Sequence, residues 1–290
     1  MRRLEKPTYD VLEFYRTCIS GVRSIELKQR LNTWSQRVVD AAELYDRYSK
    51  NNKLFEVISM QKKEAANHSV PFISKYESKN LYEYQVAKIG RPGRAVYSEL
   101  LITKNKKCPF CTVGKVKNLD HFLPKAHFPI YAVTPVNLVP SCRDCNLDKN
   151  ADVAIDARKQ TLHPYYDDAS AEQWLFAKVA IESCPPVIEY FTDSSHIKSP
   201  ELALKVQAHF IAYGLSETFT DYAADRLGEI YVDCKNRFNR EGSEELKKFL
   251  LEQKISCEND YKNSWSLAMY GALASSEWYC NGGFIEKKRD

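Results

Sequence analysis

The chain contains little glycine, with 10 residues in 290, about half of the roughly 7% that average proteins contain. Proteins rich in turns and sheet bulges need glycine for left-handed backbone, so this shortage favours helices. The sequence also has no low-complexity tract, and its hydrophobic fraction of 44% argues against intrinsic disorder. These absences predict a folded, mainly α-helical protein.

Long apolar runs are also missing, so we expect no transmembrane segment and no membrane partner. The first residues, MRRLEKPTYDV, have two arginines but no apolar stretch after them, which argues against a secretory or twin-arginine signal. The nine cysteines are an odd number, and five are scattered singly: Cys18, Cys184, Cys234, Cys257 and Cys280. This pattern is typical of buried thiols in a reducing cytoplasm, where we expect the protein to act.

The net charge of +4 is too small to identify a nucleic-acid-binding protein by itself. The charge is unevenly distributed, however. Residues 101–165 contain ten Lys and Arg against five Asp and Glu, a local excess of five positive charges. The central part of the chain is therefore the electropositive part.

Apolar periodicity divides the chain into three regions. Helical spacing of apolar residues over 11–22 and 27–45 predicts two amphipathic helices within an N-terminal helical region, 1–93. Residues 177–191 alternate like a hairpin, and Ser199-Pro200-Glu201 is a strong helix start that Gly214 would end. We therefore expect 169–290 to form a hairpin followed by a C-terminal helical region, with a separate central region at 94–168.

The central region contains two Cys-x-x-Cys pairs, Cys108 with Cys111 and Cys142 with Cys145. Two such pairs can close one tetrahedral structural zinc site. The alternative is that they are buried thiols or a redox pair, but no thioredoxin-like strand and helix surround either pair. Because 30 residues separate Cys111 from Cys142, the insert must be a structure of its own whose ends the zinc holds together.

The insert has the pattern of a strand, a loop, a second strand and a helix. Asp120 and His121 end the first predicted strand, 116–121, and Asn137 enters the second, 138–140. Asn146 lies on the helix that begins near Cys142. An Asp-His pair is usually structural, and an asparagine before a strand often only shapes a turn. Their combination inside a cysteine frame favours a hydrolytic site instead.

This arrangement resembles the HNH endonucleases, the ββα-metal finger nucleases. The phrases DHFLPKAHFP, NLVPSCRDCN and LHPYYD resemble a bacterial subgroup of HNH proteins. Some members of that subgroup are nuclease subunits of antiphage systems of the Septu type, which work beside an ATPase. The resemblance covers roughly residues 95 to 168 and does not explain the flanking helices.

The resemblance implies a role for each residue. His121 would be the general base that takes a proton from water. Asp120 and Asn146 would bind a catalytic Mg²⁺ or Mn²⁺ through oxygen atoms, and Asn137 would fix the loop that bears the base. The products would carry 5′-phosphate and 3′-hydroxyl ends.

Several cations and histidines near this site are candidates for substrate contact. Lys125, Arg143 and Lys149 could hold the phosphate backbone. His163 could line the cleft, and His127 is a weaker candidate, although either is more simply structural.

We therefore predict an α+β, mainly α-helical protein with a central zinc-stapled HNH finger between two helical regions. Its predicted function is metal-dependent cleavage of nucleic acid, DNA in preference to RNA, as an effector of antiphage defence. Two alternatives remain open. One is a zinc-held nucleic-acid-binding module without catalysis, and the other is an assembly subunit that is inactive without a partner ATPase.

Overall fold

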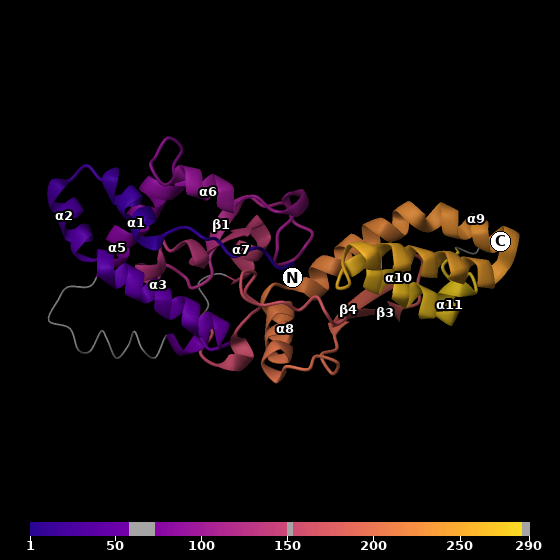
Figure 1. Cartoon of the computed structure of the whole chain (residues 1–290). Coiled ribbons are helices and arrows are strands. Elements are labelled where there is room, and N and C mark those ends of the chain that lie inside the picture. Colours follow the sequence, from indigo (N-terminus) through magenta and orange to yellow (C-terminus); the bar gives the residue numbers. More distant parts are fainter. Residues whose placement is uncertain (58–72, 150–152, 286–290) are drawn as a thin grey trace. The chain divides into compact units, whose positions relative to one another are not determined.

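In a computed structural model the chain divides into two compact units, Met1–Asp168 and Ala169–Asp290 (Figure 1). The structure describes residues 1–57, 73–149 and 153–285. The first unit includes both the N-terminal helical region (1–93) and the finger (94–168) expected from the sequence. Each unit has its own core, so each is described separately.

Helices form most of the first unit. Their bounds are α1 (Val11–Ser20), α2 (Ile25–Thr33), α3 (Ser35–Lys50), α5 (Lys75–Leu81) and α6 (Arg94–Leu100), with a short 3-10 turn η1 (Leu54–Glu56) and a π-helical segment η2 (Tyr82–Ala87). Side chains cap the starts of three of these helices, because Asp10, Ser24 and Ser74 each accept a backbone N–H of the first turn. The single helix predicted over 27–45 is wrong in one respect: the chain breaks at Trp34, which ends α2 and begins α3.

The finger follows α6 as two strands and a helix. Strands β1 (Asn118–His121) and β2 (Leu138–Ser141) pair antiparallel, with Asp120 opposite Val139 and His121 opposite Leu138. The short helix α7 (Arg143–Lys149) comes directly after β2. This order is the predicted one, although β1 begins two residues later than expected. Between the strands the chain makes the 3-10 turns η4 (Pro129–Tyr131) and η5 (Pro135–Asn137).

One apolar core joins the finger to the N-terminal helices. Leu119 of β1 and Leu138 of β2 are buried in the same cluster as Phe14 of α1, Val38 of α3 and Tyr82 of η2. Successive side chains of a strand point to opposite faces, so His121 shares the core face with Leu119, and Asp120 faces the other way. The N-terminal helices therefore pack against one face of the two strands.

The second unit packs helices against a hairpin. Strands β3 (Leu175–Ile181) and β4 (Val187–Thr192) pair antiparallel and lie against α9 (Leu215–Asp260) and α10 (Trp265–Ser275). Helix α8 (Pro200–Ala212) begins after its cap Ser199 and is followed by Gly214 at φ 54°, as predicted. Gly242, at φ 82°, interrupts α9, and α11 (Glu277–Cys280) ends the described helices.

These bounds confirm a mainly helical α+β protein whose described strands form two small two-stranded sheets. Within the described ranges, no helix combines the length and apolar character needed to cross a membrane.

Candidate metal centre and hydrolytic site

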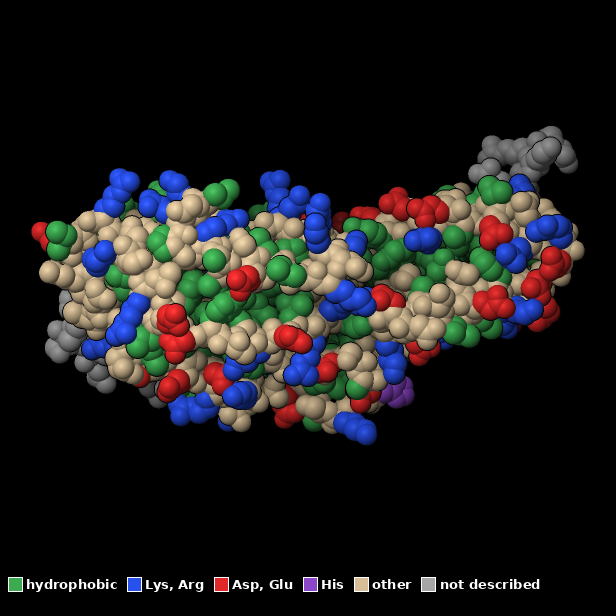
Figure 2. All heavy atoms as spheres, turned by 45° about the horizontal axis from the view of Figure 1, so that its top comes forward, with side chains coloured by type: hydrophobic (Ala, Val, Ile, Leu, Met, Phe, Trp, Pro, Cys, Tyr) green, Lys and Arg blue, Asp and Glu red, His purple; other side chains and the backbone are tan. Residues whose placement is uncertain are grey.

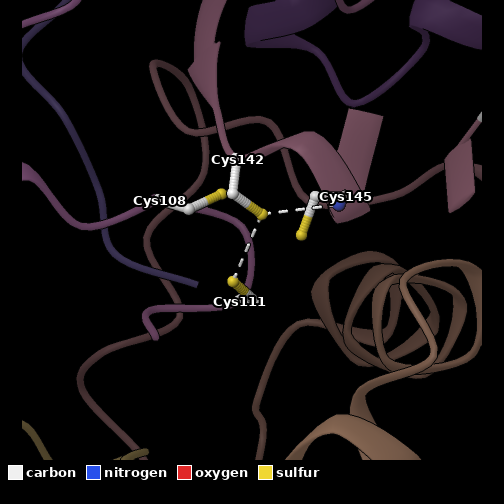
Figure 3. A group of neighbouring side chains, drawn as sticks. All are labelled: Cys108, Cys111, Cys142 and Cys145. Carbon is white, nitrogen blue, oxygen red and sulfur yellow. Dashed lines mark hydrogen bonds between the residues drawn. The ribbon is translucent and has the colours of Figure 1, made fainter. Parts of the chain in front are cut away.

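The four paired cysteines converge in space, as Figure 3 shows. Cys108 and Cys111 come from the loop before β1, Cys142 directly follows β2, and Cys145 lies on α7. All four are buried, and their sulfur atoms lie within 4.8 Å of one another. The Sγ atoms of Cys111 and Cys142 are 3.9 Å apart. A tetrahedral zinc with bonds of about 2.3 Å holds its sulfurs about 3.8 Å apart, so the group fits zinc.

Backbone N–H groups donate hydrogen bonds to two of the cysteine sulfurs. The Gly114 N–H donates to Cys111 Sγ at 3.3 Å, and the Cys145 N–H donates to Cys142 Sγ at 3.4 Å. A Cβ on Gly114 would lie 2.8 Å from Cys142 Sγ, so only glycine fits this turn. Such N–H bonds stabilise thiolates and orient them before a metal binds.

The electrostatics of the cluster favour a bound dication. Hydrogen bonds from the neighbouring thiols lower the pKa of Cys108, whereas hydrogen bonds with Cys108 and Cys111, followed by burial, raise the pKa values of Cys142 and Cys145. Four crowded sulfurs therefore cannot all ionise by themselves. A zinc ion would supply the two positive charges that allow it, so these residues could hold a structural zinc. Within the described residues, this is the one group of three or more His, Cys, Asp or Glu side chains arranged for a metal.

At the far end of β1, Asp120 forms a buried ion pair with Lys149 of α7. The Lys149 ammonium donates to Asp120 Oδ2 at 2.9 Å and to the His121 carbonyl at 2.7 Å. Asp120 and Lys149 are each only 7% exposed. Burial raises the pKa of Asp120, and the nearby Lys149 charge opposes that shift. Lys149, a predicted nucleic-acid contact, is thus an internal partner of the strand in this structure.

His121 occupies the opposite face of the strand end. Its Nε2 lies 2.9 Å from the Ala132 carbonyl oxygen, which can only accept, so Nε2 carries the proton and Nδ1 keeps its lone pair. The Tyr82 ring packs edge-on against the imidazole with centroids 4.4 Å apart. Burial, helped by the charges of Lys125 and Lys149, lowers the pKa of His121 to about 3. The imidazole is therefore neutral near pH 7.

Asn137 fixes the loop between the strands. Its side chain is fully buried; Oδ1 accepts the Leu123 N–H at 2.7 Å, and Nδ2 donates to the carbonyls of Leu123 and Tyr131 at 3.0 and 3.1 Å. These bonds hold the residues just after His121 against the turn before β2. Asn137 thus holds the loop around His121.

An aromatic layer behind the strand includes residues that sequence reasoning missed or weighed lightly. The Phe122 ring stacks on His163 with centroids 4.0 Å apart, and His163 Nε2 lies 2.9 Å from the Tyr45 hydroxyl. The Tyr165 N–H donates to His163 Nδ1, so His163 Nε2 carries the proton and donates to Tyr45. Tyr45 belongs to a helical stripe that looks like ordinary core in the sequence, and Tyr82 lies in the π-helical segment η2. Nothing in their local spacing marks them as neighbours of the site.

The remaining candidate site residues are less involved in side-chain contacts. The half-buried Lys125 ammonium lies 5.0 Å from the centre of the Tyr82 ring, and burial lowers its pKa. Arg143 is exposed on α7, and the half-buried Asn146 makes no side-chain hydrogen bond within the described residues. His127 is exposed in the loop between the strands. Its contribution to the site therefore stays a prediction.

The donor set expected for a catalytic metal is small. Asp120 offers Oδ1, because Oδ2 is taken by Lys149, and Asn146 lies one turn before Lys149 on the same face of α7. One carboxylate and one amide, completed by water, suit a hard cation such as Mg²⁺. The residues are thus compatible with the predicted ion, and its binding stays a prediction.

The chain is similar to two known proteins of different origin. No protein-family model matches it, and no solved structure is closely similar. It is 29% identical to Protein ea31 of Escherichia phage lambda over 296 residues, which cover 97% of this chain and 100% of that protein. It is 35% identical to Septu protein PtuB of Bacillus thuringiensis over 77 residues, 24% of this chain and 29% of that protein. The likeness to the phage protein is thus full-length and the likeness to the Septu protein partial.

Proposed function

We propose that the chain is a metal-dependent endonuclease of the HNH type that hydrolyses phosphodiester bonds, with DNA as its substrate. One observation carries the proposal. The end of β1 presents a neutral histidine on one face and a carboxylate on the other, inside a ββα unit whose ends meet at a four-cysteine cluster.

In this mechanism His121 is the general base. Its Nε2–H is held by the Ala132 carbonyl, which leaves the Nδ1 lone pair to accept a proton from the attacking water. A pKa of about 3 makes a weak base. Burial is the largest cause of this low pKa, and a bound phosphodiester would offset only the smaller effect of the Lys125 charge, raising the pKa of His121 in part.

Asp120 and Asn146 would hold the divalent cation. When bound there, that cation supplies positive charge for the departing 3′ oxygen. Lys149 orients the Asp120 carboxylate, and the half-buried Lys125 would contact a non-bridging phosphate oxygen. Asn137 holds the loop so that His121 and Lys125 keep their positions.

A plasmid-nicking assay with Mg²⁺ or Mn²⁺ tests this proposal. We expect wild type to nick the plasmid and His121→Ala and Asp120→Ala to lose at least about a hundredfold in rate, the usual contribution of a general base. His127→Ala is the matched control, because His127 is an exposed histidine of the loop that follows β1. Equal cleavage by wild type and both site variants would show that the site is elsewhere.

A second candidate is a subunit that stays inactive until a partner ATPase binds. The burial of His121 and the pairing of Asp120 with Lys149 favour it, because both reacting groups are covered in the isolated chain. The partial likeness to Septu protein PtuB and the full-length likeness to a phage protein support a role in conflict between phage and bacterium. Wild type that is inert alone but cleaves with the ATPase encoded beside it would establish this candidate.

A further inference from the structure

Five exposed lysines surround the first cysteine pair, and no acidic residue lies between Glu99 and Asp120. We call this group the knuckle ridge: Lys104, Lys106, Lys107, Lys115 and Lys117. A run of lysines is usually only a solvated surface. Its geometry and its lack of compensating charge distinguish this one.

The ridge is built on a rigid frame. Lys107 and Lys115 face each other in an antiparallel bridge, and the Val116 N–H donates to the Lys106 carbonyl at 2.9 Å. The Lys117 N–H donates to the Ser141 carbonyl at 2.9 Å and so extends the pairing of β1 with β2. The lysines therefore lie on two paired segments that close around the cysteine cluster and continue into the strand bearing Asp120 and His121.

Three of the five ridge lysines carry a charge that no carboxylate of the described residues neutralises. Lys106, Lys115 and Lys117 make no ion pair within the described residues, whereas other exposed lysines, such as Lys50 and Lys178, have carboxylate partners. The nearest acidic residues along the chain are occupied. Glu99 accepts the Tyr9 hydroxyl, and Asp120 pairs with Lys149. Lysine and arginine side chains gather near the middle of the upper edge in Figure 2, where this part of the first unit lies.

We propose that the knuckle ridge binds the phosphate backbone of the nucleic acid that the site acts on, an inference that rests on the proposed function. Lys117 precedes His121 by four residues, about 13 Å of extended chain at ~3.3 Å per residue. Measured along the axis of a DNA duplex, this distance spans about four base-pair steps of ~3.4 Å. The ridge thus contacts backbone beside the cleaved bond, without reading sequence, because flexible point charges bind phosphates and not base edges.

The test measures binding separately from cleavage. In a His121→Ala background, the triple variant Lys106→Gln, Lys115→Gln, Lys117→Gln is compared with His121→Ala alone for binding to a fluorescent DNA duplex across a salt series. We expect the slope of log K against log salt to become shallower by roughly 2.7, about 0.9 for each lost phosphate contact. Affinity at low salt should fall by at least about tenfold.

A matched variant with the same change of net charge is the control. Lys75→Gln, Lys198→Gln, Lys247→Gln replaces three exposed lysines that do not belong to the ridge and should keep the parent slope and affinity. Zinc content of about one per chain in both triple variants shows that the finger is intact. Equal losses of DNA affinity in the two triple variants would overturn the proposal, and so would a parent that does not bind DNA. The proposal would also fail if the ridge variant bound DNA unchanged and lost only its binding to an acidic protein partner.

The two proposals fail in different ways. Wild type that binds DNA through the ridge but never cleaves, even with a partner ATPase, removes the nuclease and leaves the ridge. Wild type that cleaves, with a ridge variant that binds and cleaves equally well, removes the ridge and leaves the nuclease.

Discussion

The four-cysteine cluster and the Asp120–Lys149 pair lie at opposite ends of the same ββα unit and balance charge in opposite ways. The cysteine cluster has four buried sulfurs, and the cationic group beside Cys108, Cys111 and Cys145 is the buried Met1 ammonium, whose pKa burial lowers to about 5. The Asp120 carboxylate has an internal cation 2.9 Å away. One end could hold an external dication, and the other is balanced by an internal lysine.

Under the proposed function, the difference would let one short unit combine a structural metal with a reactive site. A closed four-sulfur zinc site uses all its ligands and offers no position to substrate, so a zinc bound there would hold the fold. A carboxylate balanced by lysine keeps one oxygen available for a second ion. Structural and chemical roles would then be separated along about 30 residues of chain, and we expect that each end can be disrupted without the other.

The largest effect is expected at the cysteine end. Cys142→Ser should remove one zinc ligand, and the free energy of zinc binding, on the order of 10 kcal/mol, is folding free energy for such a site. We expect metal analysis to fall from about one zinc per chain to near zero, with loss of cooperative unfolding in the first unit.

Cys184→Ser controls for the loss of a thiol, because Cys184 is an exposed cysteine of the second unit. It should keep zinc and stability unchanged. Purified wild type without zinc would show that the sulfurs are only buried thiols, and the contrast between the two ends would disappear.

A smaller but still large effect is expected at the other end. Lys149→Met leaves Asp120 buried without its partner, which should lower the free energy of unfolding by about 3–5 kcal/mol. Denaturant unfolding of the first unit measures it, and zinc content should not change.

The double variant Asp120→Asn, Lys149→Met tests whether the loss of stability comes from the unpaired Asp120 charge. It removes both charges, so it should lose less stability than Lys149→Met alone. Lys178→Met, which breaks the exposed pair with Glu189, should cost less than about 1 kcal/mol. Equal losses for Lys149→Met and Lys178→Met would mean that Asp120 does not depend on an internal cation.

The cysteine end could be predicted from sequence, and the other end only in part. Two Cys-x-x-Cys pairs show their shared ligand function through spacing alone, and they do converge. Ser199 and Gly214 likewise bound α8 by local rules of capping and left-handed backbone. Asp120 and His121 were found through a motif, which identifies residue types but not the partners that set their protonation.

Those partners are distant in sequence, which is why they were missed. Lys149 is 29 residues from Asp120, and Tyr45 is 118 residues from His163. A lysine on a short helix predicts a surface contact unless the buried carboxylate beside it is known. A tyrosine in an amphipathic stripe looks the same whether it fills a core or supports a histidine. The break at Trp34 also lies inside an unbroken apolar period, so periodicity could not locate it.

The smallest effect is expected in the aromatic layer of Phe122, His163 and Tyr45. A substitution there tests whether this layer helps to position the Asp120 end of β1. Tyr45→Phe removes the acceptor of His163 Nε2–H and should cost about 1–3 kcal/mol in thermal unfolding, because a buried donor is left unpaired. Tyr15→Phe is matched, since the buried Tyr15 hydroxyl donates to the Leu31 carbonyl in the same unit. If His163 positions Phe122 and the adjacent His121, cleavage should fall about tenfold in Tyr45→Phe and stay near wild type in Tyr15→Phe. Parallel losses of activity in the two variants would mean that the layer is ordinary core, and that the reactive end is held by Asn137 and Lys149 alone.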